Sequence, residues 1–522
     1  MDQPGGDEGA VRDHPRSTRP GLNWTASLNA GASALDYVAR AVVEFVVNPI
    51  LVAGLGSFLY GAWRTLWRMT GYLWAASGRS GQALQIAVAR RQRDDDDHLK
   101  QRLVGAAVAV WFAFLPLLLI IGAVGVWFVP ELIDTPARYV TAVRWTAALL
   151  WLDSVALSLF TLPKSVLQGE NLGFKRMGLT TALVIGGGVG TAVAVEMGAG
   201  IVGVAVVNLA NTVLTGALFL RVVKQHVPWF GFARPHRAEF RSFLGVSAWF
   251  TGWKFVNQLL LAGDVAILAI AGSVTLVTDY TLTKFAPEAT LPLLSLAVQG
   301  VMPGLGGILG ADEHERSRRL RGEIIAGVWL LATAAAVGVL VLNRSFVDLW
   351  VGGRYFAGDV ANLLIVLSFL QLAVIRTDAA VIDLTMRIER KVLVGALSVG
   401  LTIVFGVVAL RTLDLGIAGL VGALILGRSV LTFMYPRMVG AAVGVSMASQ
   451  IRAAVRPVLA AAVLIGTAYG VGTRIEISSW LVLVPAGVVV GALAVPVAAV
   501  LGLTAGQRGA LISRIDKARR RV

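Results

Sequence analysis

The stretch that decides the fold is LNAGASALDYVARAVVEFVVNPILVAG, residues 28–54. A helix needs about 20 apolar residues to cross a bilayer, so this stretch is long enough to do so. It also carries four polar residues at a regular spacing that places them on one face of a helix: Asp36, Arg40, Glu44 and Asn48. Because a charged side chain that faces lipid costs several kcal/mol, we expect this face to look at a partner helix or a water-filled cavity.

The composition of the whole chain is that of a membrane protein. Of its 522 residues, 56% are hydrophobic and only 15% are charged, whereas a soluble protein carries about 25% charged residues. The mean hydropathy is +0.73. The net charge of +15 does not indicate a nucleic-acid partner, because basic nucleic-acid-binding domains are not this apolar. The chain has no cysteine, which excludes disulfides, thiol catalysis and cysteine metal sites.

Apolar runs alternate with short polar breaks along the chain. This pattern predicts an all-α integral membrane protein with about 14 transmembrane helices. The expected helices span residues 28–54, 59–78, 103–129, 139–162, 178–196, 200–220, 242–271, 279–302, 323–343, 359–382, 391–411, 416–434, 457–473 and 479–504.

The basic residues predict the orientation. If the N-terminus is inside, the cytoplasmic segments hold about 33 Lys and Arg residues and the opposite segments about 5. Cytoplasmic loops of membrane proteins carry such an excess of basic residues. We therefore expect a multi-pass protein with both termini in the cytoplasm.

An internal repeat at an offset of about 216 residues predicts two related lobes. Lys175-Arg176 corresponds to Arg390-Lys391, and Gly200-Ile201-Val202-Gly203 corresponds to Gly416-Ile417-Ala418-Gly419. An even number of helices separates the halves, so the repeats are parallel. The expected division is a disordered cytoplasmic tail (1–25), an N-lobe of six helices (26–220), a basic linker (221–241), a C-lobe of six helices (242–434), two further helices (435–504) and a basic cytoplasmic tail (505–522).

The first two helices are expected to form a hairpin that turns near Gly54 to Tyr60. This geometry places Glu44 level with Arg68 and predicts an ion pair between them, which leaves Arg64 without an acidic partner. The second lobe repeats the pattern with charged residues on its first two helices: Lys254, Asp264, Lys284 and Glu288.

Two interpretations of these intramembrane charges stay open. They can hold helices together, as polar residues in membranes do, or they can line a water-filled cavity between the lobes. A cavity with several cations suits an anionic group such as a pyrophosphate. The candidate substrate-binding cations are Arg40, Arg64, Arg68, Lys254 and Lys284, and the candidate charge-balancing or coupling acids are Asp36, Glu44, Asp264 and Glu288.

Two prolines are candidate hinges in these helices. Pro49 and Pro287 each remove a backbone donor and crowd the carbonyl of the preceding turn. No nucleotide-binding GxxxxGK[ST], zinc-binding HExxH or nucleophilic GxSxG motif occurs. We expect no metal, no cofactor and no catalytic residue, and therefore a protein that is not an enzyme.

Several short motifs resemble the polysaccharide transporter family, the O-antigen flippase branch of the multidrug/oligosaccharidyl-lipid/polysaccharide exporter (MOP) superfamily. The matching residues are Leu55-Gly56, Tyr60-Gly61-Ala62-Trp63, Gly71-Tyr72-Leu73, Gly81-Gln82-Ala83-Leu84, Gln168-Gly169, Lys175-Arg176, Gly272 and Tyr280. The resemblance covers roughly residues 25–440. The charges at Asp36, Arg40 and Glu44 depart from the plainer first helix of that family, so no family role is carried over to them.

The resemblance implies two six-helix lobes around a central cavity lined largely by the first two helices of each lobe. It implies a flippase of the bacterial cytoplasmic membrane that moves a polyprenyl-pyrophosphate-linked oligosaccharide across by alternating access, for export of cell-surface polysaccharide. The implied partners are that lipid-linked glycan and membrane lipids, with a polysaccharide polymerase and glycosyltransferases as candidate protein partners. We expect a monomer and no nucleic acid.

Three alternatives remain at this stage. A cation-coupled multidrug exporter of the same superfamily would favour acids and aromatic residues in the cavity, and the basic excess here argues against it. A lipid II flippase of the superfamily is a close alternative. A membrane glycosyltransferase or polymerase is disfavoured, because the longest loop on the outer side covers only about residues 343–359.

Overall fold

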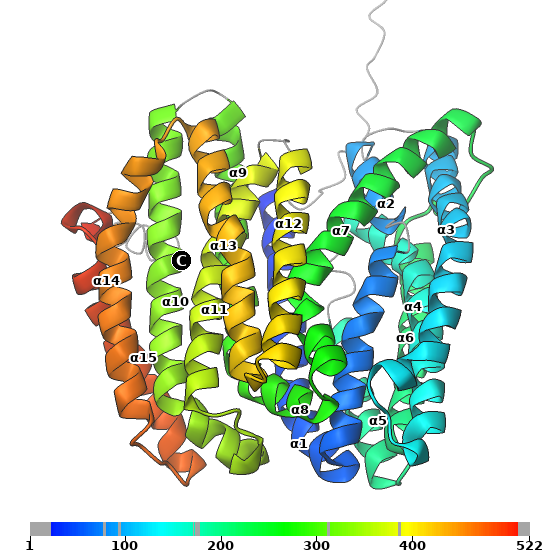
Figure 1. Ribbon diagram of the computed structural model, residues 1–522. Helices are drawn as coiled ribbons and strands as arrows, with labels where there is room; N and C mark the ends of the chain where they lie inside the picture. Colours follow the sequence, from blue (N-terminus) through cyan, green and yellow to red (C-terminus); the bar gives the residue numbers. More distant parts are fainter. Residues whose placement is uncertain are drawn as a thin grey trace, which may run out of the picture.

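The computed structural model describes residues 22–76, 80–91, 96–170, 172, 178–310, 314–384 and 388–509, and in these ranges the regular structure is helical throughout. Long helices run side by side as a bundle (Figure 1). They are α1 (Leu22–Ala76), α2 (Ser80–Arg90), α3 (Asp97–Leu132), α4 (Val140–Gly169), α5 (Leu179–Glu196), α6 (Gly200–His226), α7 (Arg237–Ala271), α8 (Val274–Thr283), α9 (Phe285–Gly310), α10 (His314–Val351), α11 (Asp359–Leu384), α12 (Ile388–Val407), α13 (Gly416–Val443), α14 (Met447–Gly472) and α15 (Trp480–Gly502).

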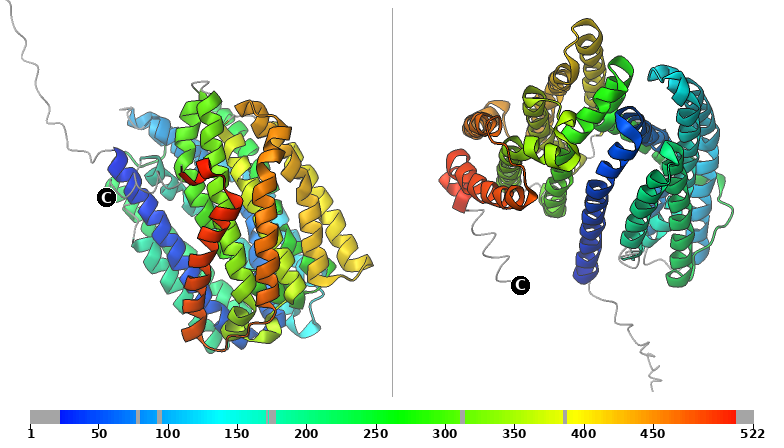
Figure 2. Two further views of the ribbon diagram at one scale, coloured as in Figure 1. Left: turned by 90° about the vertical axis from the view of Figure 1, so that its left-hand side faces the viewer. Right: turned by 90° about the horizontal axis from the view of Figure 1, so that it is seen from below.

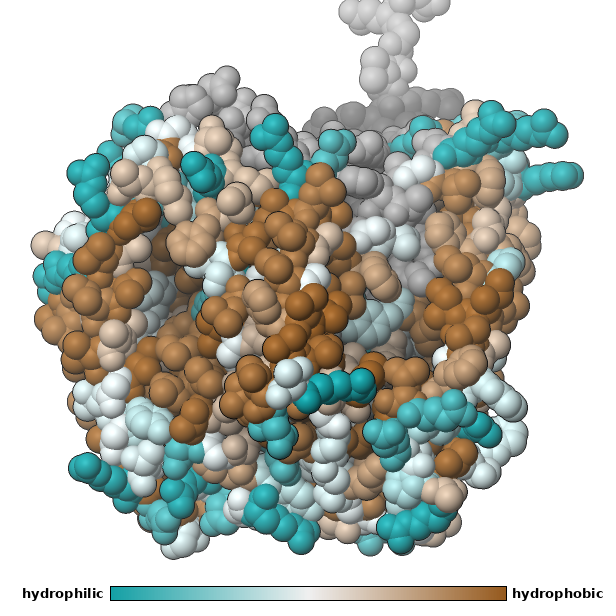
Figure 3. Space-filling view, in the orientation of Figure 1, coloured by the Kyte–Doolittle hydropathy of each residue, from teal (hydrophilic) through white to brown (hydrophobic). Residues whose placement is uncertain are grey.

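Twelve helices in the described ranges are long and apolar enough to cross a membrane. Figure 3 shows the matching surface: a broad hydrophobic belt, with hydrophilic side chains gathered above and below it. One of the twelve, α1, reverses direction and supplies two of the predicted helices. Another predicted helix corresponds to α8 and α9 together, so the fold agrees with the expected membrane bundle.

The reversal in α1 occurs at Gly56, which has φ 75° and ψ 171°. Residues with a Cβ rarely adopt this conformation, and glycine does so readily. The Tyr60 hydroxyl donates to the Asn48 side-chain oxygen at 3.2 Å, although twelve residues of straight helix would span about 18 Å. The predicted hairpin is therefore confirmed.

The predicted helix 279–302 is wrong in one respect, because the structure divides this region between α8 and α9 at Lys284. Pro287 has no N–H to donate to the carbonyl of Thr283, one turn earlier. The Asn343 side-chain amide, on α10, donates to that carbonyl instead, at 2.8 Å. The carbonyl that Pro287 leaves without its helical donor is thus satisfied by a side chain of α10. A short helix that the apolar pattern did not predict, α2, follows α1.

The helices separate into two groups (Figures 1 and 2). Helices α3–α6 form the first group, and α1 packs against α4 and α5 on its inner side. Helices α9–α13 form the second group, with α14 and α15 against α10, and α8 packs against α9, α10 and α13. Helix α7 runs diagonally between them, and its first turns join the first group through an Arg102–Glu239 ion pair of 3.0 Å. The tails 1–21 and 510–522 lie outside the described residues.

Glycines allow close packing within the first group. A Cβ on Gly188 would lie 2.5 Å from the side chain of Val43, and one on Gly190 would lie 2.9 Å from Val207. Helices in membranes associate through such close van der Waals contacts, because lipid is as apolar as the side chains. The glycine-rich run 186–190 therefore joins α5 to α1 and α6.

The two groups meet at the end of the bundle that holds the α1 turn, called the hairpin end from here on. One buried hydrophobic cluster there includes Leu51, Tyr60, Val274 and Trp350. The Thr278 hydroxyl of α8 donates to the Ser57 carbonyl of α1 at 2.6 Å. The hairpin end is therefore closed by contacts between the groups.

Candidate functional site

A cavity of about 200 Å³, with apolar side chains and a set of charged ones in its wall, lies inside the bundle. Its wall comes mainly from α7, α8, α9, α11 and α13, and Arg68 reaches it from the second half of α1. The charged and hydroxyl groups in the wall are Arg68, Asp264, Tyr280, Lys284, Glu288, Ser368, Arg376 and Arg428. Apolar side chains such as Leu261 and Phe369 complete it.

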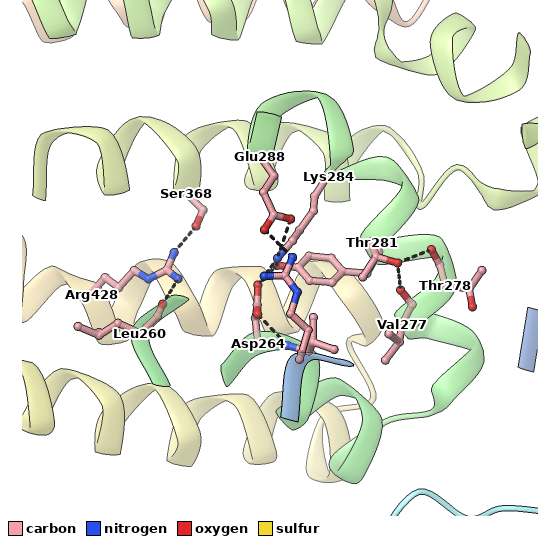
Figure 4. A network of polar contacts seen from close by, with 12 residues as sticks. Leu260, Asp264, Val277, Thr278, Thr281, Lys284, Glu288, Ser368 and Arg428 are labelled. Carbon is pink, nitrogen blue, oxygen red and sulfur yellow. Dashed lines mark hydrogen bonds and ion pairs between the residues drawn. The ribbon is translucent and has the colours of Figure 1, made fainter. Parts of the chain in front are cut away.

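Asp264 and Lys284 form the centre of the polar network (Figure 4). The Lys284 ammonium lies 2.5 Å from a carboxylate oxygen of Asp264, and the Tyr280 hydroxyl donates to the same oxygen at 2.6 Å. Both charged side chains are nearly buried, with exposed fractions of 10% and 5%. Lys284 owes its position to the break between α8 and α9, where it is the last residue before the second helix begins.

Arg68 connects the two helix groups through Glu288. Its guanidinium lies 2.5 Å from one Glu288 oxygen, and Lys284 lies 3.7 Å from the other. The predicted Glu44–Arg68 ion pair is therefore wrong. The turn of α1 directs the Arg68 side chain toward Glu288 of α9, in the second group.

Two arginines of the wall have no acidic partner among the described residues. Arg428 donates to the Ser368 hydroxyl at 2.9 Å and to the Leu260 carbonyl at 2.8 Å, and it lies to one side of the acids in Figure 4. Arg376 has neither a hydrogen-bond nor an ion-pair partner within the described ranges. Four cations and two carboxylates line the cavity, so its formal charge is +2.

The charged face of the first half of α1 lies opposite a side of exposed valines. Val38, Val42 and Val46 are about half exposed on one side of the helix. Arg40 and Glu44 are also exposed, but 100° per residue places them on the opposite side. Figure 2 shows this part of α1, the darkest blue helix, between the two groups when seen from below.

Two contacts define what the charged face meets. Asp36 accepts a long hydrogen bond of 3.5 Å from Thr181 on α5, in the first group. The Tyr37 hydroxyl donates to the Ala289 carbonyl on α9, in the second group. Arg40 and Glu44 lie between these two directions, so they face the space between the groups, although neither lines the cavity of about 200 Å³.

The remaining predicted residues fall into two sets. Asp264, Lys284, Pro287, Glu288 and Arg68 lie together in the cavity wall. Arg64 is half-buried on α1, and its Nε has no hydrogen-bond partner in the described part of the chain. Lys254 is half-buried on α7 and does have a partner. Pro49 lies within α1 near the hairpin end.

The prediction missed Tyr280, Arg376 and Arg428 as site residues. Each had a visible signal, because Arg376 and Arg428 are charges within apolar spans and Tyr280 is one of the family-like residues. The sequence did not show in which direction each helix turns these side chains. The expectation placed the cavity wall largely on the first two helices of each lobe, whereas α11 and α13 also turn a charged side toward it.

The arrangement can attract an anion without breaking its internal ion pairs. No carboxylate balances the charge of Arg376 or Arg428 among the described residues. One guanidinium group can donate two parallel hydrogen bonds to the oxygens of a phosphate. Among the described residues, no group of three or more His, Cys, Asp or Glu side chains could hold a metal ion.

No protein-family model matches the chain, and no curated protein sequence matches it. Solved structures do have a similar fold. The lipid II flippase MurJ in an inward closed conformation matches with a TM-score of 0.65 and 11% identity, over 90% of this chain and 98% of that chain. A multidrug resistance MATE family transporter of the MOP superfamily matches in its inward-facing conformation with a TM-score of 0.59 and 15% identity, over 78% and 98% of the two chains.

An outward-facing structure of a MATE family transporter gives a TM-score of 0.55 at 15% identity, over 82% of this chain and 100% of that one. The TM-scores and coverages show that the chain shares the fold of these three structures. The polysaccharide branch of the superfamily stays a prediction from the short motifs.

Proposed function

We propose that this chain is a flippase that carries a polyprenyl-pyrophosphate-linked oligosaccharide across the bacterial cytoplasmic membrane by alternating access. The single observation behind the proposal is the cavity with a formal charge of +2, in which Arg376 has no partner among the described residues. A pyrophosphate would supply the missing negative charge. Both termini would lie in the cytoplasm, and the hairpin end would face outward, as the distribution of basic residues predicts.

The first half of α1 suits a substrate that is polar at one end and a lipid at the other. Its valine side is exposed, and its Arg40 and Glu44 side faces the space between the groups. A lipid tail would stay against the valines while the pyrophosphate and sugars pass on the charged side. The proposed transport would need no cofactor, and the protein would act as a monomer and not as an enzyme.

A lipid II flippase is the second candidate. It is favoured by the fold match to MurJ, a flippase of that substrate. Lipid II also has a polyprenyl pyrophosphate, so the positive charge of the cavity fits both substrates equally well. A cation-coupled multidrug exporter would have to bind a cation in a wall of net positive charge, which is unfavourable.

The test is to replace the unpartnered cation and follow the substrate. Arg376→Gln leaves no carboxylate without its partner, so the fold should survive the change. We expect glycan export to fall about tenfold or more, because a charge-assisted hydrogen bond contributes about 1.5–3 kcal/mol. The lipid-linked oligosaccharide should accumulate in the inner leaflet, measured with an impermeant lectin on vesicles of both orientations.

The matched control is Arg474→Gln, which removes the same charge from an exposed position near the hairpin end. It should export at the parental rate. Normal export by a well-expressed Arg376→Gln variant would contradict the proposal. Accumulation of lipid II instead of an oligosaccharide carrier on depletion of the protein would select the second candidate.

A further inference from the structure

The inference concerns Trp350 and the backbone carbonyl of Phe45. In a regular helix the N–H of residue 49 donates to the carbonyl of residue 45, and Pro49 has no N–H. The helix nevertheless continues through this position, since the only non-helical residue inside α1 is Gly56. The Phe45 carbonyl is therefore left without its normal partner inside α1.

Trp350 supplies the missing donor from the other helix group. Its indole N–H, in the last turn of α10, donates to the Phe45 carbonyl at 2.7 Å. The two rings also stack, with centroids 5.6 Å apart and an angle of 5° between their planes. Trp350 is 7% exposed, so the bond is shielded from competing water.

The Thr283 carbonyl, which Pro287 leaves without a helical donor, provides a comparison. Asn343 satisfies the Thr283 carbonyl freed by Pro287, and both residues belong to the second group. That bond can persist when the groups move relative to each other. The Trp350–Phe45 bond joins the groups, so any opening of the hairpin end between α1 and α10 must break it.

We propose that Trp350 and the Phe45 carbonyl form a latch that holds the hairpin end closed, and that Pro49 creates this latch by freeing the carbonyl. This inference rests on the proposed transport cycle. Opening costs the latch bond and leaves a carbonyl that α1 cannot satisfy internally. Trp350 is thus a positioning residue, which sets how often the outer side opens without touching the site in the cavity.

The absence of cysteine in the chain allows a direct measurement of opening. Val274 is 2% exposed and faces Gly61 of α1, where a Cβ would lie 2.9 Å from its side chain. A Val274→Cys reporter is therefore accessible only when α1 separates from α8. The rate at which an impermeant maleimide labels it in intact cells reports the open fraction.

In the reporter protein, Trp350→Phe keeps an aromatic ring and removes only the donor. We expect labelling to rise about two- to tenfold, the factor that corresponds to one hydrogen bond of ordinary net strength. Pro49→Ala restores an N–H for the Phe45 carbonyl, so Trp350→Phe should change the labelling rate much less in that background. A merely structural role of Trp350 would give equal effects in both backgrounds.

Trp480→Phe is the matched control, because Trp480 contacts the same Phe45 ring edge-on at 5.8 Å and gives that carbonyl no hydrogen bond. It should label near the parental rate. The latch is overturned if Trp350→Phe labels at the parental rate, if Pro49→Ala leaves its effect unchanged, or if Trp480→Phe matches it. These outcomes leave the proposed function intact, since that function is tested separately by the export of Arg376→Gln and by the lipid that accumulates on depletion.

Discussion

At the scale of single residues, the charged side chains of the cavity wall neutralise one another only in part. Asp264 and Lys284 neutralise each other, and Arg68 and Glu288 do so across the two helix groups. Buried ion pairs of this kind contribute little net stability, but removing one partner leaves a charge that nothing compensates. The pairs therefore hold the site in shape, while Arg376 and Arg428 provide the surplus charge.

The Asp264–Lys284 pair gives a prediction at this scale. Asp264→Asn or Lys284→Met alone should lower the free energy of unfolding by about 3–5 kcal/mol, because each leaves a buried charge without its partner. The double variant should recover most of the loss. Thermal unfolding of the detergent-purified protein measures all three, and a double variant as unstable as the worse single variant would contradict the prediction.

At the scale of single helices, backbone interruptions shape the site more than helix length does. The turn at Gly56 folds α1 back on itself, so that its second half brings Arg68 to the cavity. The break at Lys284 places that ammonium beside Asp264. Both interruptions have local causes: a glycine conformation and a proline that lacks its N–H.

Gly56 can be tested by adding one methyl group. Gly56→Ala should destabilise the protein by about 1–3 kcal/mol, because its backbone conformation is strained for a residue with a Cβ. Gly186→Ala is the control, since Gly186 lies in α5 and a Cβ there would meet no atom within 4 Å. Thermal unfolding should separate the two variants, and equal midpoints would show that Gly56 tolerates a side chain.

At the scale of the whole molecule, two groups of helices are closed against each other at the hairpin end. The contacts there include the Thr278–Ser57 hydrogen bond, the Trp350–Phe45 hydrogen bond and one continuous hydrophobic cluster. The proposed transport by alternating access requires this end to open, so a covalent link across it should stop the cycle.

A Ser57→Cys, Thr278→Cys protein tests this requirement. Treatment of this otherwise cysteine-free chain with a cleavable bifunctional thiol reagent should abolish glycan export, and cleavage of the reagent should restore it. Each single-cysteine variant, treated in the same way, controls for modification alone. Undiminished export by the fully cross-linked protein would rule out opening at this end.

The sequence by itself determined the membrane bundle, the hairpin of α1 and the charged character of its first half. These properties depend on local features: the length of apolar runs, a spacing of four residues, and a glycine at the turn. Asp264, Lys284 and Glu288 could also be identified as site residues, since charges within apolar spans are costly unless they meet a partner or water.

Only the tertiary structure decided which charges meet. The Arg68 side chain pairs with Glu288 and not with Glu44, and Arg376 and Arg428 join the same wall from α11 and α13. Likewise, Pro49 showed which carbonyl lacks a donor, but not that Trp350, about 300 residues later, supplies one. The physical reason is rotation: a helix that turns 100° per residue can present a charge in any direction, and packing between distant helices selects one.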